Sequence, residues 1–294
     1  MANATLALPP VTVQDIEVSA QNLDVRHAAK IYREHGCLVV RGLMKPYIAQ
    51  LQQDIEQSAR RALELLDQAE KVKEGWRTPD GTLFLPAPKN FKRDKQIMVL
   101  RVGYTTSAAF FRAAVDEKAV ELVSAIVGPN VELFMDGQCL YKEPVGGHPK
   151  KLHQDAAYFE HKLEGPVAAL NYAVDTDLAN GALHVVPGSH KLGLLKHIDT
   201  FSHLGLAEDE WPWEKALPIR GQAGDSIFFH VKTIHGSKEN FSARPRPVFI
   251  NRYRSVDDCT VAYATSTANR ATAGNSGPKP KEQNGIMVRG YRAY

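Results

Sequence analysis

The stretch that decides the fold is VELFMDGQCLYKE, residues 131–143, because the sequence pattern changes from helical to strand-like there. From this point short apolar runs alternate with turns. Five further runs follow: VAALNYAVD (167–175), ALHVVPGSH (182–190), LPIRG (217–221), DSIFFHV (225–231) and RPVFINRYRS (246–255). Several short strands at such spacing predict an all-β sandwich or barrel.

The residues before this stretch favour helices. Residues 24–35 have an apolar face and are followed by Gly36, and a second helix begins near Lys45–Pro46 with apolar residues at helical spacing. A third helix, 115–127, is stopped by Gly128–Pro129. CLVVRGL (37–43) and IMVLRVGY (97–104) read as strands, and Trp76–Arg93 as a loop.

One domain is the simplest organisation, because the helices need the outer face of a sheet to bury their apolar stripes. We expect a helical part over about 1–128, a β core over about 131–256 and an irregular tail over 257–294.

Composition limits the classes of function. A net charge of +3 is too small to indicate nucleic acid or an acidic membrane as partner. No stretch reaches the roughly 18 apolar residues of a membrane span. Three widely spaced cysteines without a CxxC fit a reducing compartment. With no basic, apolar leader at the start, we expect a cytoplasmic protein.

The basic excess lies in the tail, which is either simply flexible or closes over an anionic ligand; its cations are Arg270, Lys279, Lys281, Arg289 and Arg292.

Chemistry is indicated by KLHQDAAYFE, residues 151–160. In an extended strand His153 and Asp155 point to the same side. Alone, an HxD pair is more often a solvent-facing strand end. However, His235 follows the apolar strand 227–231, and two histidines with one carboxylate can occupy one face of an octahedral Fe(II). Arg246, eleven residues later, can pair bidentately with a carboxylate beside such a metal.

Several motifs together resemble the phytanoyl-CoA dioxygenase family of Fe(II)/2-oxoglutarate-dependent oxygenases. They are His153-Gln154-Asp155, Tyr158-Phe159, NGALHVVPGSHK (180–191), GDSIFFH (224–230) and IHGSKENFSARPRP (234–247). The resemblance covers roughly residues 37–255. It implies a double-stranded β-helix, or jelly roll, flanked by N-terminal helices.

The resemblance also implies roles for single residues. His153, Asp155 and His235 match the iron ligands, Arg246 matches the arginine that binds the distal carboxylate of 2-oxoglutarate, and Ser237 matches a hydroxyl that supports it. Further cosubstrate candidates are Gln138 and, more weakly, Lys142.

Substrate contacts are less defined. Tyr158 and Phe159 are expected as pocket walls, and the sheet offers Arg101, Asn171 and Arg252. Arg246, Arg252 and Arg254 are separated by even numbers of residues on one strand, so all three side chains can face inward. Their counterion is then supplied either by a protein carboxylate such as Asp136 or by an anionic substrate.

The predicted function is an oxygenase that uses Fe(II), 2-oxoglutarate and O₂ to hydroxylate or otherwise oxidise a small molecule, with succinate and CO₂ as coproducts. A carboxylate at Asp155, where related halogenating enzymes have a small residue, argues against halogenation. The alternative is a jelly-roll protein that binds a metal or ligand without redox chemistry. The sequence does not name the substrate, and it allows an anionic metabolite or a natural product. We expect Trp76–Arg93 and Lys191–Trp213, with or without the tail, to form a lid over the iron; the alternative is that these segments are solvated connections.

Overall fold

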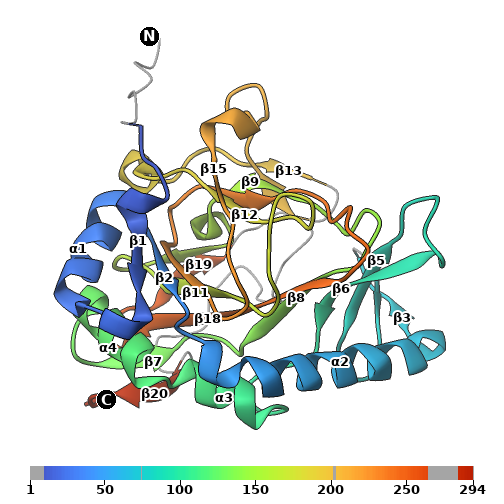
Figure 1. Ribbon diagram of the computed structural model, residues 1–294, viewed down its shortest axis with the longest axis horizontal. Coiled ribbons are helices and arrows are strands. Elements are labelled where there is room, and N and C mark those ends of the chain that lie inside the picture. Colours follow the sequence, from blue (N-terminus) through green and yellow to red (C-terminus); the bar gives the residue numbers. More distant parts are fainter. Residues whose placement is uncertain (1–9, 74, 201–202, 264–283, 294) are drawn as a thin grey trace.

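The computed structural model describes residues 10–73, 75–200, 203–263 and 284–293 (Figure 1). A large sheet lies in the middle, with helices on one side and a small sheet on the other. The predicted class, mainly β with flanking helices, is confirmed.

Helices in the described part are α1 Val25–His35, α2 Ile48–Glu64, α3 Ala108–Ala114 and α4 Glu117–Val127. The start of α1 is fixed by Asp24, whose carboxylate accepts the N–H groups of Arg26 and His27 at 2.9 and 3.0 Å. It ends at Gly36, which adopts a left-handed φ of 68° that glycine tolerates best.

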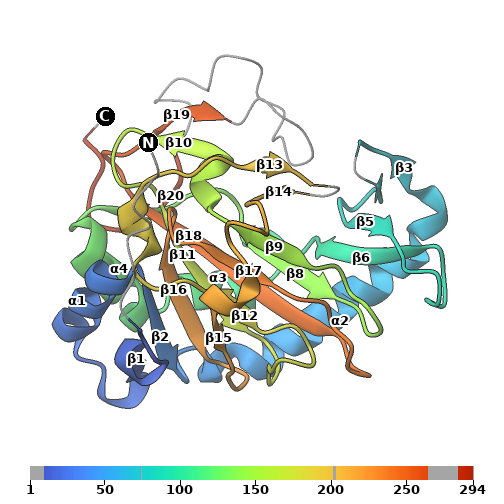
Figure 2. The same cartoon turned by 90° about the horizontal axis from the view of Figure 1, so that it is seen from above.

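The large sheet contains twelve strands within the described ranges. In order across the sheet, the first ten are β1 Glu17–Ser19, β2 Cys37–Arg41, β16 Ser226–His230, β11 Val167–Tyr172, β18 Arg246–Ser255, β8 Gln138–Lys142, β6 Lys95–Leu100, β5 Leu83–Pro86, β4 Trp76–Arg77 and β3 Glu70–Lys71. The other two are β7 Val131–Leu133, which pairs with β18, and β20 Ile286–Arg289, which pairs with β7. Figure 2 shows β16, β11 and β18 side by side.

The small sheet faces the large one, and its order is β15 Leu217–Ile219, β12 Leu183–Val185, β17 His235–Ser237 and β9 Lys150–His153. Two strand pairs lie outside both sheets: β10 Phe159–His161 with β19 Thr260–Tyr263, and β13 Ile198–Asp199 with β14 Leu204–Gly205. The two facing four-strand groups, β16-β11-β18-β8 and β15-β12-β17-β9, give the predicted jelly roll.

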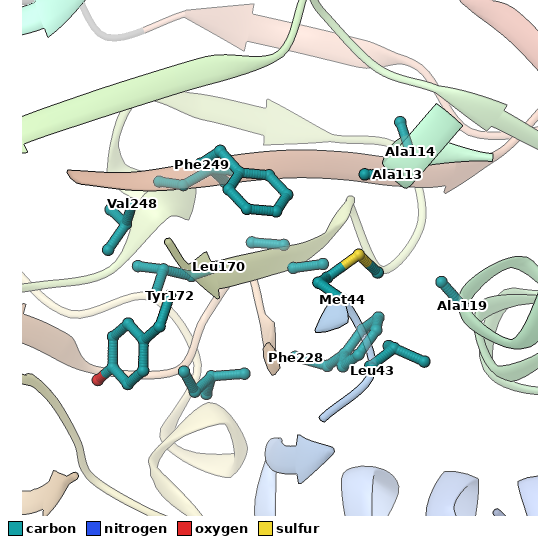
Figure 3. Packing of buried hydrophobic residues seen from close by; sticks show 14 of the residues in the cluster. Leu43, Met44, Ala113, Ala114, Ala119, Leu170, Tyr172, Phe228, Val248 and Phe249 are labelled. Carbon is teal, nitrogen blue, oxygen red and sulfur yellow. The ribbon is translucent and has the colours of Figure 1, made fainter. Parts of the chain in front are cut away.

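The main core lies between the large sheet and the helices. Phe228 and Phe249 are fully buried there, together with Met44 and Ala113 (Figure 3). Phe110 of α3 packs edge-on against Phe249, with ring centroids 5.3 Å apart. The helices therefore do bury their stripes on the outer face of the sheet, as the sequence predicts.

Two local expectations were wrong, and one helix was missed. The tail after residue 256 is not wholly irregular, because β19 and β20 form there, while Arg270, Lys279 and Lys281 lie outside the described residues. The segment Trp76–Arg93 contains β4 and β5, and α3 was not foreseen. Pairing with β10 and β7, far away in the sequence, decides β19 and β20, and this is not visible in a local pattern. β4 and β5 pair with each other and with their sequence neighbours β3 and β6.

Candidate metal and cosubstrate site

His153 ends β9, and Asp155 begins the 3-10 turn that follows. Gln154 between them keeps an extended backbone, with φ −116° and ψ 133°. His153 and Asp155 therefore turn to the same side, as the HxD spacing predicts. The imidazole Nε2 of His153 lies 3.7 Å from Oδ1 of Asp155.

His235 begins β17 directly opposite His153 in the register of the small sheet. The centroids of their rings are 4.3 Å apart. His235 Nε2 also lies 3.7 Å from Asp155 Oδ1, and one ligand atom from each residue falls within 4.8 Å of the others. The structure thus brings all three predicted ligands to one point.

Both histidines present the correct nitrogen for a metal. Nδ1 of His153 bonds the carbonyl oxygen of Lys151 at 2.8 Å, and Nδ1 of His235 bonds that of Thr233 at 2.9 Å. A carbonyl can only accept, so Nδ1 carries the proton and Nε2 keeps its lone pair toward Asp155. Such a backbone bond is the usual support of a metal-binding histidine.

Burial sets the charge state of the three groups. Burial lowers the pKa of His153 to about 3 and also lowers the pKa of His235, so both rings are neutral at pH 7. Burial alone would raise the pKa of Asp155, but the guanidinium of Arg252 and the two histidines bring it below its usual value. Two neutral imidazoles and one carboxylate are the donor set that suits Fe(II).

Gly236 allows the two ligand strands to approach. A Cβ at this position would lie 2.7 Å from the carbonyl oxygen of Lys150 and 3.0 Å from the nitrogen of Leu152. A side chain there would push β9 away from β17. The glycine after His235 therefore contributes to the close pairing of the two histidines.

The three candidate ligands line a cavity of about 390 Å³ between the two sheets, and Arg246 and Ser237 line the same cavity. Arg246 is 2 % exposed, and its guanidinium bonds the carbonyl of Gly181 while Nε has no partner. Burial without a carboxylate lowers its pKa to about 10. A buried arginine in this state favours an anionic ligand, and 2-oxoglutarate offers a carboxylate.

The other two cosubstrate candidates differ in placement. Gln138 lines the cavity beside Arg252. Lys142 pairs with Arg246 across β8 and β18 but is not among the cavity-lining residues. Its ammonium donates to the carbonyl of His148, and burial holds its pKa well below the usual range. Lys142 therefore packs behind the cavity wall.

Of the expected substrate contacts, Tyr158, Phe159 and Arg252 line the cavity. Asn171 does not, because it faces the opposite side of β11 from Leu170, where its amide bonds Ser226 Oγ at 2.6 Å. Arg101 also lies outside the lining, in an ion pair with Asp136 at 2.8 Å.

The ion pairs of the large sheet show that Asp136 is not the counterion of the arginines on β18. Asp136 pairs with Arg101, whereas Arg254 pairs with Glu132 at 2.7 Å. Arg252 lies 3.7 Å from Asp155, and its bonds to Gln138 Oε1 are 3.4 Å long. Arg246 and Arg252, an even number of residues apart on β18, both line the cavity as predicted, while Arg254 forms an ion pair with Glu132, which also pairs with Arg292.

Described residues of 191–200 and 203–206 support the HxD backbone. His203 Nε2 accepts the N–H of Lys151 at 2.7 Å, and His197 Nε2 accepts the N–H of Gln154 at 2.9 Å. The buried amide of Gln154 donates to the carbonyls of Gly193 and Lys232 at 2.8 and 2.7 Å and accepts from Leu195 at 2.8 Å.

No described residue of Trp76–Arg93 or Lys191–Trp213 lines this cavity, and closure of these segments over it stays a prediction. The sequence did not single out Met98, Val99, Met135 or Lys150, which do line it. For Met135 and Lys150 the available signal was their position shortly before Gln138 and His153. Met98 and Val99 lie on β6, and the pairing of β6 with β8 is not visible in the local sequence. His230, five residues before His235, lies away from the three ligands and bonds Glu164 at 3.2 Å in a second cavity.

Comparison with known families gives a match over residues 32–248 to Phytanoyl-CoA dioxygenase (PhyH). The chain belongs to the phytanoyl-CoA dioxygenase family. This assignment confirms the resemblance, and with it the predicted enzyme class, a non-haem iron oxygenase that depends on 2-oxoglutarate. The neutral histidines, the carboxylate and the uncompensated arginine fit the Fe(II) and 2-oxoglutarate of that class.

Individual relatives are distant. The chain is 30% identical over 151 residues to a probable alpha-ketoglutarate-dependent hypophosphite dioxygenase of Stutzerimonas stutzeri, covering 48% of this chain and about half (51%) of that protein. It is 27% identical over 262 residues to the peroxisomal phytanoyl-CoA dioxygenase of Mus musculus, covering 82% of this chain and 72% of the relative.

Among solved structures, the carbocyclase SnoK of nogalamycin biosynthesis matches with a TM-score of 0.62 at 18% identity, over 92% of this chain and 96% of SnoK. The epimerase SnoN in complex with Fe³⁺, alpha ketoglutarate and nogalamycin RO matches with a TM-score of 0.61 at 18% identity, over 90% of this chain and 98% of SnoN. These matches establish a shared fold. Within the described residues, no helix has the length and apolarity needed to cross a membrane.

Proposed function

We propose that the protein uses Fe(II), 2-oxoglutarate and O₂ to oxidise a small-molecule substrate, in the simplest case by hydroxylation, and releases succinate and CO₂. One observation carries this proposal: the His153, Asp155 and His235 cluster shares one cavity with Arg246, a buried cation that has no carboxylate partner in the described chain. A protein that only bound a metal would have no use for that arginine.

Each residue has a defined task in this proposal. His153, Asp155 and His235 would hold the metal at the wall of the cavity. Arg246, with Ser237 in the lining of the same cavity, binds the distal carboxylate of 2-oxoglutarate and so orients the cosubstrate. Iron with 2-oxoglutarate and O₂ supplies the oxidising power. Leu170, Leu183 and Phe229 give the cavity an apolar wall that limits water.

Membership of the family does not determine which substrate is oxidised or how. The neighbours with this fold include a carbocyclase and an epimerase, so the fold alone leaves the type of oxidation open. The carboxylate of Asp155 occupies the position that a halide would need, which supports oxygen transfer or related oxidation rather than halogenation.

Succinate formation tests the proposal. The protein, loaded with Fe(II) without O₂, is mixed with 2-oxoglutarate, ascorbate and O₂, and succinate is measured with and without a panel of metabolites. We expect slow succinate formation without substrate and faster formation with it. The absence of both succinate formation and metal-dependent 2-oxoglutarate binding would favour the alternative, a binding protein without oxygenase chemistry.

A further inference from the structure

We propose that the substrate of this site carries a negatively charged oxyanion, such as a carboxylate, that binds Arg252, while its apolar part lies against Met98, Val99 and Met135. The inference rests on the proposed oxygenase function and adds the chemical class of the substrate.

Arg252 lines the cavity without a short bond. Its side chain is 13% exposed, its two terminal nitrogens are each 3.4 Å from Gln138 Oε1, and its Nε, 3.7 Å from Asp155, makes no hydrogen bond. Charge-assisted bonds of arginine are normally about 2.7–2.9 Å long. Arg254, two residues later, makes such a bond with Glu132 at 2.7 Å. Arg252 is thus held in place but not neutralised.

Metal binding would leave Arg252 with even less compensation. Its nearest carboxylate, Asp155, is one of the proposed metal ligands. The two charges of a divalent metal and the charge of Arg246 are balanced by Asp155 and the two carboxylates of 2-oxoglutarate. Arg252 then remains as a buried positive charge, which is costly without a counterion.

No other carboxylate of the cavity lining can serve as that counterion. Asp136 also lines the cavity, but it is paired with Arg101 at 2.8 Å and accepts the N–H groups of Tyr104 and Gly137. The further charged residue of the lining, Lys150, is a cation. The described wall therefore favours an anion in addition to the cosubstrate.

The part of the cavity wall next to Arg252 is apolar. Met98 and Val99 of β6 and Met135 line the cavity, and Met135 is 48% exposed. Met135 adopts a φ of 66°, which is strained for a residue other than glycine, and the bonds of Asp136 hold this turn. A rigidly held, exposed methionine beside a cation suits a substrate with an apolar body and an anionic group.

Binding of simple probes tests the proposal without knowledge of the true substrate. The protein is loaded with Co(II) and saturated with N-oxalylglycine, an inert analogue of 2-oxoglutarate, so that Arg246 is occupied. Straight-chain carboxylates of four to eight carbons and their neutral amides are then titrated by calorimetry, with the visible Co(II) spectrum as a second readout. We expect the best carboxylate to bind about tenfold or more tightly than its amide.

Two variants and a control assign this preference to Arg252. Arg252→Gln should remove the preference for the carboxylate, and Arg252→Lys should keep part of it, with N-oxalylglycine affinity and melting temperature near wild type. Arg244→Gln removes the same charge from an exposed position next to β18 and should change nothing.

Three results would overturn the proposal. The first two are no carboxylate preference in the wild type and an unchanged preference in Arg252→Gln. The third is a loss of N-oxalylglycine affinity in Arg252→Gln, which would make Arg252 a cosubstrate residue. Failure of the Co(II) protein to bind N-oxalylglycine at all would instead contradict the proposed oxygenase function, and the anion proposal with it.

Discussion

His153 and His235 lie directly opposite each other on the antiparallel strands β9 and β17, with ring centroids 4.3 Å apart. Each ring donates from Nδ1 to a backbone carbonyl, so the two Nε2 lone pairs converge on the region in front of Asp155. Two lone pairs and a carboxylate that face one another have no hydrogen to share. A bound metal ion satisfies all three at once.

Removal of the carboxylate should therefore abolish the metal site. We expect Asp155→Ala to lower Fe(II) or Co(II) affinity by at least about 100-fold, since even residues that only support metal ligands contribute about 10- to 100-fold. Succinate formation should be lost with it. Asp136→Asn is the matched control for metal affinity alone, because Asp136 lines the same cavity and its bonds go to Arg101, Tyr104 and Gly137. Full metal affinity and turnover in Asp155→Ala would refute the ligand assignment.

Arg246 should determine the affinity for 2-oxoglutarate. A hydrogen bond to a charged group contributes about 1.5–3 kcal/mol, so Arg246→Ala should weaken 2-oxoglutarate binding by about 10- to 150-fold. Arg246→Lys should recover only part, because one ammonium cannot reproduce a bidentate fork. The measurement is calorimetric titration of 2-oxoglutarate into the Co(II) protein. Unchanged affinity would point to Arg252 as the cosubstrate arginine.

Stability should fall as the pH is lowered below about 6.5. Burial lowers the pKa values of His161 and His230 to about 4, whereas histidine in an unfolded chain has a pKa near 6.5. Between these values the unfolded chain binds protons that the folded chain does not, so the stabilisation is complete above pH ~6.5 and declines toward pH ~4. The loss should be on the order of 1 kcal/mol per histidine at pH 5.

Urea unfolding of the apoprotein at pH 7.5 and at pH 5 measures this loss. His230→Asn should reduce the difference between the two pH values, whereas His27→Asn, at an exposed position, should leave it unchanged. An equal difference in wild type and His230→Asn would show that His230 contributes nothing to the pH dependence.

The sequence predicted those parts of the site that depend on local spacing. The HxD motif needs only an extended backbone, which Gln154 has, and the common parity of Arg246 and Arg252 needs only one regular strand. The same rule explains why Asn171, expected to contact the substrate, does not line the cavity. Leu170 lines the cavity, so its neighbour Asn171 must face the helices. A strand's two faces alternate, and the sequence alone did not reveal which face of β11 was inward.

Features that depend on distant contacts could not be predicted. β19 and β20 are short strands that exist because β10 and β7 offer pairing edges. Lys142 follows Gln138 on β8 and pairs with Arg246, yet its ammonium turns to the carbonyl of His148. The irregular, histidine-rich segment after Lys191 suggested a lid, although its histidines accept backbone N–H groups of the HxD strand.

This support of the HxD strand leads to a prediction for Gln154, His197 and His203 as positioning residues. Gln154 is fully buried, and its amide joins the metal-ligand turn to Gly193, Leu195 and Lys232. Gln154→Ala would leave three backbone groups unpaired and free the peptide between the two ligands. We expect about 10- to 100-fold weaker metal binding and a loss of about 1–3 kcal/mol in stability.

His197→Ala separates positioning from general stability, because only one bond to the HxD backbone, from the N–H of Gln154, is lost. We expect weaker Co(II) binding and a shifted Co(II) spectrum, and partial rescue in His197→Asn, whose side-chain oxygen can accept an N–H. His190→Ala is the matched control: His190 precedes the same segment, and its Nε2 bonds Arg33 in α1, away from the ligands. A ligand turn that has lost its position cannot bind the metal unchanged. If Gln154→Ala and His197→Ala lowered the melting temperature but kept the wild-type Co(II) affinity and spectrum, the segment would therefore only stabilise the fold.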